Sequence, residues 1–187
     1  MKYYKKLVGE RIYLSPMNIE DAEKYAEWLS DFKTTDGLGK SNSMTNVISE
    51  KEWIENSSKN NDLSFAIVKL ENDELIGNCG IMKIRQKDRC AEVGIFIGDE
   101  QNRGKGYGAE ALMLLLDFCF NYQNLHNVQL SVMSFNTRAI NCYKKVGFKE
   151  YGKRRECYFL NGKYYDRVYM DILSNEFTGS YIKNKNI

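Results

Sequence analysis

A short glycine-rich turn separates an apolar stretch from a helical pattern in the middle of the chain. Residues 92–110 read EVGIFIGDEQNRGKGYGAE, and the turn itself contains Gly104, Gly106 and Gly108. Glycine lets the backbone approach a ligand closely, and the first N–H groups of a helix have no partner inside the helix. These N–H groups lie at the positive end of the helix dipole and bind phosphate groups in many proteins. The turn therefore predicts a site for a phosphate-bearing cofactor.

Two common nucleotide-binding motifs fit this turn poorly. A loop that binds a nucleoside triphosphate needs Ser or Thr after Gly-Lys to hold magnesium, but Lys105 is followed by Gly106. A dinucleotide site needs the pattern G-x-G-x-x-G/A, which Gly104, Gly106 and Ala109 satisfy. That pattern normally follows the first strand of a fold and is followed by an acidic residue about 20 residues later. Residues 131–134 offer no carboxylate, so we favour another cofactor over a dinucleotide. A turn whose glycines only let the loop change direction is the alternative without a cofactor, and we favour it less.

The elements around the turn predict a mixed α/β domain. Alternating apolar residues and turn-forming residues indicate strands joined by short, mostly antiparallel connections. The exception is the strand before the turn, the helix after it and the next strand, a unit long enough for a right-handed parallel crossover. The expected strands cover residues 10–14, 63–70, 74–85, 90–97, 128–133, 151–159 and 163–173; the expected helices begin at Asn18 and Ser49 and cover 106–122 and 136–145.

Two parts of the chain are expected to lack regular structure. Residues 31–47 are polar and contain glycine, so they predict a long loop. Residues 174–187 predict a polar C-terminal tail after a single domain that spans residues 1–173. The dipeptide Asn161-Gly162 predicts a type I′ turn between the last two strands.

Composition and charge narrow the class of protein. A net charge of +2 on 187 residues gives no sign of a nucleic-acid partner. No stretch reaches the length of a membrane span, and no apolar run follows the basic start of the chain as in a secretion signal. We therefore expect a cytoplasmic protein without a membrane partner. The cysteines are scattered and never form a C-x-x-C pair, which argues against a metal site or a disulfide framework: Cys79, Cys90, Cys119, Cys142 and Cys157.

Two segments together resemble the signature motifs of the GNAT N-acetyltransferases. Gln101 to Gly106 matches the pattern Q-x-x-G-x-G of their diphosphate loop, and Asn136 to Phe148 is similar to their second motif, N-x-x-A-x-x-x-Y-x-K-x-G-F. The motifs occur in the family's order with a strand between them, which is more specific than either motif alone. Residues 159–166 also resemble the final hairpin of the ribosomal-protein N-acetyltransferase and bacterial spermidine acetyltransferase branch. The resemblance implies the GNAT fold, a mostly antiparallel twisted sheet flanked by helices with a central strand–helix–strand crossover.

The resemblance also implies acetyl-CoA as the cosubstrate and indicates where it would bind. The diphosphate would lie on backbone amides of the glycine turn, at Arg103, Gly104, Lys105, Gly106, Tyr107 and Gly108. The pantetheine arm would pair with the preceding strand and pass close to the helix of the second motif, at Ile95, Phe96, Ile97, Asn136, Ala139 and Tyr143. The charges of Arg103 and Lys105 would add an attraction that salt screens.

Acetyl transfer to an amine needs a base for the amine and a proton for the departing thiolate. Tyr143 matches the family tyrosine placed near the sulfur and is the candidate acid, although a tyrosine packed in the core would give the same pattern. Glu92 is the candidate base, because alternation along the strand places Glu92, Gly94 and Phe96 on one face. An ordinary ion-paired surface glutamate is the alternative. A backbone N–H near Phe96 would stabilise the oxyanion.

The acceptor would enter opposite the cofactor, between residues 31–47, Trp53 and the final hairpin. Four carboxylates in these segments would make the entrance acidic, unless they are simply solvated loop charges: Asp31, Asp36, Glu156 and Asp166. We therefore expect a primary amine as the acceptor, namely a protein N-terminus, a polyamine or an aminoglycoside amino group. A non-catalytic GNAT-fold module that binds CoA or another ligand is the competing class. A homodimer is a further hypothesis, with Phe177 and Tyr181 as interface residues.

Overall fold

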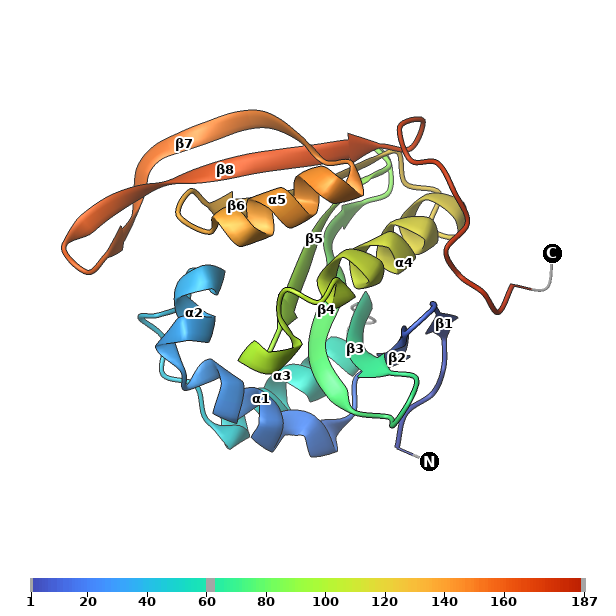
Figure 1. Cartoon of the computed structure of the whole chain (residues 1–187), viewed down its shortest axis with the longest axis horizontal. Helices are drawn as coiled ribbons and strands as arrows, with labels where there is room; N and C mark the ends of the chain where they lie inside the picture. The colour runs from blue at the N-terminus through green and yellow to red at the C-terminus, as the bar shows by residue number, and fades with distance from the viewer. Residues whose placement is uncertain (1, 60–62, 186–187) are drawn as a thin grey trace.

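The strands of the protein form one mixed sheet, shown in Figure 1 as a computed structural model that describes residues 2–59 and 63–185. The sheet has eight strands in the order β1-β2-β3-β4-β5-β6-β8-β7. In chain order these are β1 (Leu7–Val8), β2 (Ile12–Pro16), β3 (Leu63–Lys69), β4 (Leu75–Arg85), β5 (Cys90–Ile97), β6 (Asn127–Met133), β7 (Lys149–Leu160) and β8 (Lys163–Leu173).

The only parallel neighbours among the described strands are β5 and β6, which confirms the predicted crossover. They pair at three positions only: Cys90 with Asn127, Ala91 with Val128, and Glu92 with Gln129. Beyond Glu92 the two strands diverge, so the sheet opens into a V whose arms are β5 and β6 (Figure 1). On the outer side of the V, β5 stays paired with β4 and β6 stays paired with β8. The divergence leaves one backbone edge of β5 without a neighbouring strand.

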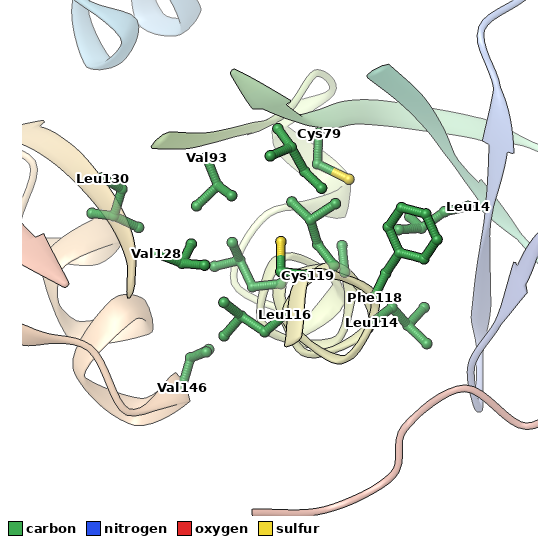
Figure 2. Close-up of a cluster of buried hydrophobic side chains, with 14 of the residues drawn as sticks. Leu14, Cys79, Val93, Leu114, Leu116, Phe118, Cys119, Val128, Leu130 and Val146 are labelled. Carbon is green, nitrogen blue, oxygen red and sulfur yellow. The ribbon is translucent and has the colours of Figure 1, made fainter. Parts of the chain in front are cut away.

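Helices cover both faces of the sheet. They are α1 (Ala22–Leu29), α2 (Phe32–Leu38), α3 (Val47–Lys59), α4 (Tyr107–Asn121) and α5 (Thr137–Val146). The helix α4 lies in the larger core and is surrounded by apolar side chains from the strands and from α5 (Figure 2). On the opposite face, Tyr25 and Trp28 of α1 pack with Ile54 of α3 against the strands. None of the described helices is long and apolar enough to cross a membrane.

The segment 31–47 differs from the sequence prediction, because it contains the helix α2. The side chain of Asp31 accepts a hydrogen bond from the N–H of Lys33, which caps the first turn. The helix ends at Gly39, whose φ of 68° is in the left-handed region that glycine adopts readily. The segment FKTTDGL has only two large apolar residues, at its ends, so it offers no apolar stripe to read.

Smaller differences concern the element ends. The helix α3 begins at Val47, before the expected Ser49, because Asn46 and Ser49 cap it reciprocally: the N–H of each donates to the side chain of the other. The short strand β1 at the edge of the sheet was not expected from the sequence, and β7 is longer than predicted at both ends. The predicted turn at Asn161-Gly162 is confirmed, since both residues have positive φ, 48° and 78°.

The C-terminal segment 174–185 packs on the domain rather than extending from it. Asp117, a fully buried residue of α4, accepts hydrogen bonds from the N–H groups of Tyr181 (2.6 Å) and Ile182 (3.0 Å). The ammonium group of Lys185 lies 2.8 Å from the same carboxylate. The aromatic ring of Phe177 packs on Phe120 of α4. Phe177 and Tyr181 thus contact the core of their own chain, and their arrangement gives no support to their role in a homodimer.

Candidate active site

A cavity of about 640 Å³ lies in the V between β5 and β6. Its walls come from β5, β6, β8, the glycine turn, the first turn of α4, α5 and α2. This volume is within the range of ordinary cofactor and ligand sites. Most of the residues predicted from the sequence line this one cavity: Glu92, Ile95, Phe96, Ile97, Arg103, Gly104, Gly106, Gly108, Asn136, Ala139 and Tyr143. The structure therefore brings together two motifs that are far apart in the sequence.

The glycine turn contains two residues in the left-handed region of backbone conformation. Gly104 and Gly106 have φ angles of 73° and 88°, which a residue with a side chain adopts only with strain. The helix α4 begins directly after Gly106. Within the described part of the chain, the N–H groups of residues 104–109 donate to no other protein group. They are therefore available for a phosphate at the positive end of α4.

Arg103 differs from its predicted role. Its N–H donates to the carbonyl of Glu100 (3.0 Å), so it is not free for a diphosphate. Its guanidinium group donates to the carbonyls of Ile97 (3.0 Å) and Gly98 (2.6 Å) and to the hydroxyl of Thr34 (2.6 Å). Burial, together with the nearby charge of Arg138, lowers the pKa of this group from its usual value. Arg103 thus connects the end of β5 to α2, and its guanidinium group is engaged in these hydrogen bonds.

Two predicted residues of the turn, Lys105 and Tyr107, do not line the cavity. The carbonyl of Lys105 points to Arg11, which donates to it at 2.9 Å. The guanidinium carbon of the same arginine lies over the ring of Tyr107, 4.8 Å from the ring centre. The side chain of Tyr107 is thus held by Arg11 outside the cavity lining.

Glu92 lies at the point where β5 and β6 separate, and it lines the cavity. Along β5 it shares a face with Phe96, whose ring packs edge-on against Trp28 of α1. Val93 points to the other face, where it belongs to the core around α4 (Figure 2). The carboxylate of Glu92 is ion-paired with Lys83 at 2.8 Å, and it keeps partial exposure. It is thus both a cavity residue and an ion-paired glutamate.

Tyr143 reaches the cavity from α5, on the face of the sheet that carries α4. Its ring packs edge-on against Phe148, and its hydroxyl has no hydrogen-bond partner among the described residues. Burial raises the pKa of Tyr143 to about 12. The phenol therefore stays protonated near neutral pH and can donate a proton.

Asn136 begins α5 and is tied to α2. Its side-chain oxygen accepts from the N–H of Ala139 (3.2 Å), which caps the helix. Its amide group donates to the carbonyl of Gly37 at 3.3 Å. Arg103, which follows β5, also donates to Thr34 of α2. Hydrogen bonds therefore connect α2 to both arms of the V.

The lining of the cavity is strongly basic, which the sequence analysis did not detect. One carboxylate, Glu92, stands among the cationic residues of the lining: Lys33, Lys40, Arg103, Arg138, Lys145 and Arg167. Such a lining attracts a ligand with several negative charges. These residues come from α2, the loop directly after it, the glycine turn, α5 and β8, so no local pattern could have revealed them together. Of these cations, Arg103 was singled out from the sequence. Arg138 and Lys145 lie two turns apart on α5, a spacing that could have indicated a shared basic face.

The four carboxylates expected at the acceptor entrance do not form one cluster. Asp31 caps α2, and Asp166 is paired with Lys153 and accepts from the N–H of Glu156. Asp36 lines a second cavity of about 700 Å³, which lies between α2 and the β7–β8 hairpin. Among the described residues, its lining includes the exposed aromatic rings of Phe32 and Phe159 and no cationic side chain. Its charge is thus opposite to that of the cavity in the V.

A diverging parallel strand pair, a glycine turn at a helix start and a basic cavity define a site for an extended cofactor with phosphate groups. Residues 11–149 match the family described as acetyltransferase (GNAT) domain, and this chain belongs to that family. GNAT acetyltransferases use acetyl-CoA, and the basic cavity and free N–H groups fit an anionic cofactor. The resemblance deduced from the two motifs is confirmed.

Relatives and solved structures agree with this assignment. The uncharacterized N-acetyltransferase p20 of Bacillus licheniformis is 31% identical over 92% of this chain and 98% of its own length. Spermidine N(1)-acetyltransferase of Vibrio cholerae is 36% identical over 55% of this chain and 59% of its own length. The crystal structure of spermidine N-acetyltransferase from Vibrio cholerae in complex with CoA and spermine superimposes with a TM-score of 0.81, at 24% identity, over 89% of this chain and 97% of that chain. This last likeness concerns the fold.

Proposed function

We propose that this protein transfers the acetyl group of acetyl-CoA directly to a primary amine, with Glu92 as base and Tyr143 as acid. The proposal is supported by one arrangement: both side chains line the cavity in the V, and they reach it from opposite faces of the sheet. An acceptor on the α1 face and a thiolate on the α5 face would then each have a proton-transfer group. Acetyl-CoA supplies an activated thioester, whose carbonyl carbon the amine attacks.

The residues divide the work in this proposal. Glu92 accepts a proton from the attacking amine, directly or through a water molecule, because an ammonium ion has no lone pair for attack. The backbone edge of β5, left without a neighbouring strand beyond Glu92, offers N–H groups near Phe96 for the oxyanion and for the pantetheine arm. Tyr143 gives its proton to the thiolate as the C–S bond breaks. The N–H groups of residues 104–108 and the basic lining hold the phosphates.

The acceptor class rests on the relatives' names and on the second cavity. The named relatives include spermidine acetyltransferases, and Asp36 with its aromatic neighbours would suit an amine that carries a further positive charge. A protein N-terminus and an aminoglycoside amino group stay open as acceptors. We also propose a reducing, cytoplasmic setting, with which the five free cysteines agree.

A panel of amines with acetyl-CoA tests the proposed function. We expect acetyl-CoA to raise the melting temperature, and at least one amine among spermidine, peptides with free N-termini and kanamycin-like compounds to release free thiol. A thiol assay and mass spectrometry of the acetylated product measure the transfer. Binding of acetyl-CoA without turnover on any amine would favour the non-catalytic module. No thermal stabilisation at millimolar acetyl-CoA would contradict both.

Replacing Tyr143 by phenylalanine should slow transfer by about 10²-fold without abolishing it, because a thiolate leaves without full protonation. The raised pKa of Tyr143, about 12, means that its phenol stays protonated from pH 6 to 10. The loss should therefore be the same across this range, and the shape of the pH–rate profile should not change. Tyr122→Phe is the matched control, since Tyr122 is half exposed at the end of α4. A loss that grows or vanishes with pH would argue against this role.

A further inference from the structure

Arg11, which precedes β2, lies directly behind the glycine turn and outside the cavity. Its guanidinium group makes three contacts at once. One nitrogen donates to the carbonyl of Lys105 (2.9 Å), another donates to the carboxylate of Glu110 (2.9 Å), and the plane lies over the ring of Tyr107 (4.8 Å). A Cβ atom added to Gly106 would lie 3.1 Å from the same group. Arg11 therefore contacts Lys105 and Tyr107, and it occupies the space beside Gly106 where a side chain would lie.

Glu110 of α4 holds both the guanidinium group and the backbone of Arg11. The other oxygen of its carboxylate accepts hydrogen bonds from the N–H groups of Glu10 and Arg11, each at 2.8 Å. The carbonyl of Arg11 in turn accepts from the N–H of Leu70 (2.9 Å), so its backbone is also held by the residue that directly follows β3. Both the backbone and the guanidinium group of Arg11 are thus anchored. An arginine with its fork geometry can make these contacts together, which a lysine cannot.

The contact with Lys105 determines the direction of a neighbouring N–H group. A peptide unit is planar and trans, so its C=O and N–H point in opposite directions. Because the carbonyl of Lys105 points to Arg11, the N–H of Gly106 points away from Arg11. Gly104 and Gly106 line the cavity, and Arg11 does not. Two of the three residues in the Gly-Lys-Gly turn are glycines, which accept many backbone conformations, so the turn's own sequence does not fix the orientation of this peptide unit.

We propose that Arg11 is a positioning residue, which locks the Lys105–Gly106 peptide unit so that its N–H faces the diphosphate of the cofactor. This inference rests on the proposed function, because it assumes that the turn binds CoA. The charge of Arg11 is paired with Glu110 and lies behind the turn. Arg11 therefore acts through backbone geometry, and its effect should persist at salt concentrations that screen the free charge of Lys105.

The test compares two acetyl donors, one with and one without the diphosphate. In Arg11→Met, we expect the Kd for CoA, measured by calorimetry, to rise about tenfold, the value of one hydrogen bond to a charged partner. The KM for acetyl-CoA should rise by a similar factor with little change in kcat. With S-acetylpantetheine, which has no diphosphate, kcat/KM should be unchanged. Arg89→Met is the matched control, because Arg89 also donates to a backbone carbonyl, that of Asn124, outside the cavity lining.

Two further variants keep the proposal testable if Arg11→Met folds poorly. Arg11→Lys and Glu110→Gln each leave part of the network, and both should weaken CoA binding while sparing S-acetylpantetheine. Equal losses with both donors would show a merely structural role and would overturn the inference. So would unchanged CoA affinity in all three variants of a protein whose wild type binds CoA. If the wild type itself binds no CoA, the proposed function fails instead.

Discussion

Glu92→Gln should lower kcat for acetyl transfer by about 10²-fold or more and leave the affinity for CoA unchanged. The glutamine fills the same space at the point where β5 and β6 separate, but it cannot accept a proton from the amine. Because the carboxylate is an acceptor-side group, the donor site should be intact. The variant is measured by steady-state thiol release with an amine from the panel and by calorimetry with CoA.

The pH dependence distinguishes a lost base from a lost ion pair. Alkylamines have pKa values near 10, so the neutral, reactive fraction of the acceptor rises steadily with pH. The difference in kcat between the wild type and Glu92→Gln should therefore shrink as the pH rises from 7 to 10, because more of the amine is already neutral when it binds. Glu55→Gln removes a comparable surface pair, that with Lys59, and should have no effect. A deficit that is constant with pH, or none at all, would count against Glu92 as the base.

The parts of the site that depend on local sequence could be predicted. The turn from Gln101 to Gly106 and the motif from Asn136 to Phe148 each specify their own backbone, through glycines at positive φ and a helix cap. The hairpins and the crossover follow from alternation, turn residues and connection length, and all are confirmed by the strand pairing. Local chemistry was sufficient because the residues that shape each element lie within it.

The rest depends on contacts between distant segments. Arg11 and Lys105 are 94 residues apart, and nothing in either segment indicates the other. Arg103 was expected to be a free charge, yet its partners include Thr34 from a segment expected to be a loop. The basic lining likewise combines residues of several elements. Long-range polar contacts leave no periodic pattern, whereas apolar faces do, so the sequence could place the cavity but could not predict the groups that hold its wall.

Asp117→Ala should destabilise the protein by roughly 3–5 kcal/mol, the usual cost of removing one partner of a buried ion pair. Asp117 is fully buried, and its removal would leave four donors without their acceptor: the N–H groups of Tyr181 and Ile182, Asn121 and Lys185. The segment 174–185 should then detach from α4. Urea unfolding measures the loss of stability, and limited proteolysis should cleave the variant near its C-terminus before the wild type.

A mutant cycle and the pH dependence test the same contact. In a Lys185→Ala background, Asp117→Ala should cost about 0.5–3 kcal/mol less than in the wild type, because the ion pair is already lost. Burial alone would raise the pKa of Asp117, but its hydrogen bonds from Lys185, Asn121, Ile182 and Tyr181 outweigh burial and lower it. A lowered pKa in the folded state stabilises the protein above the unfolded value, about 3.9, and this contribution disappears as the pH falls through the folded value. The stability difference between the wild type and Asp117→Asn should therefore be constant from pH 8 to 5 and shrink below about 4, and a difference that grows on acidification would contradict the assignment.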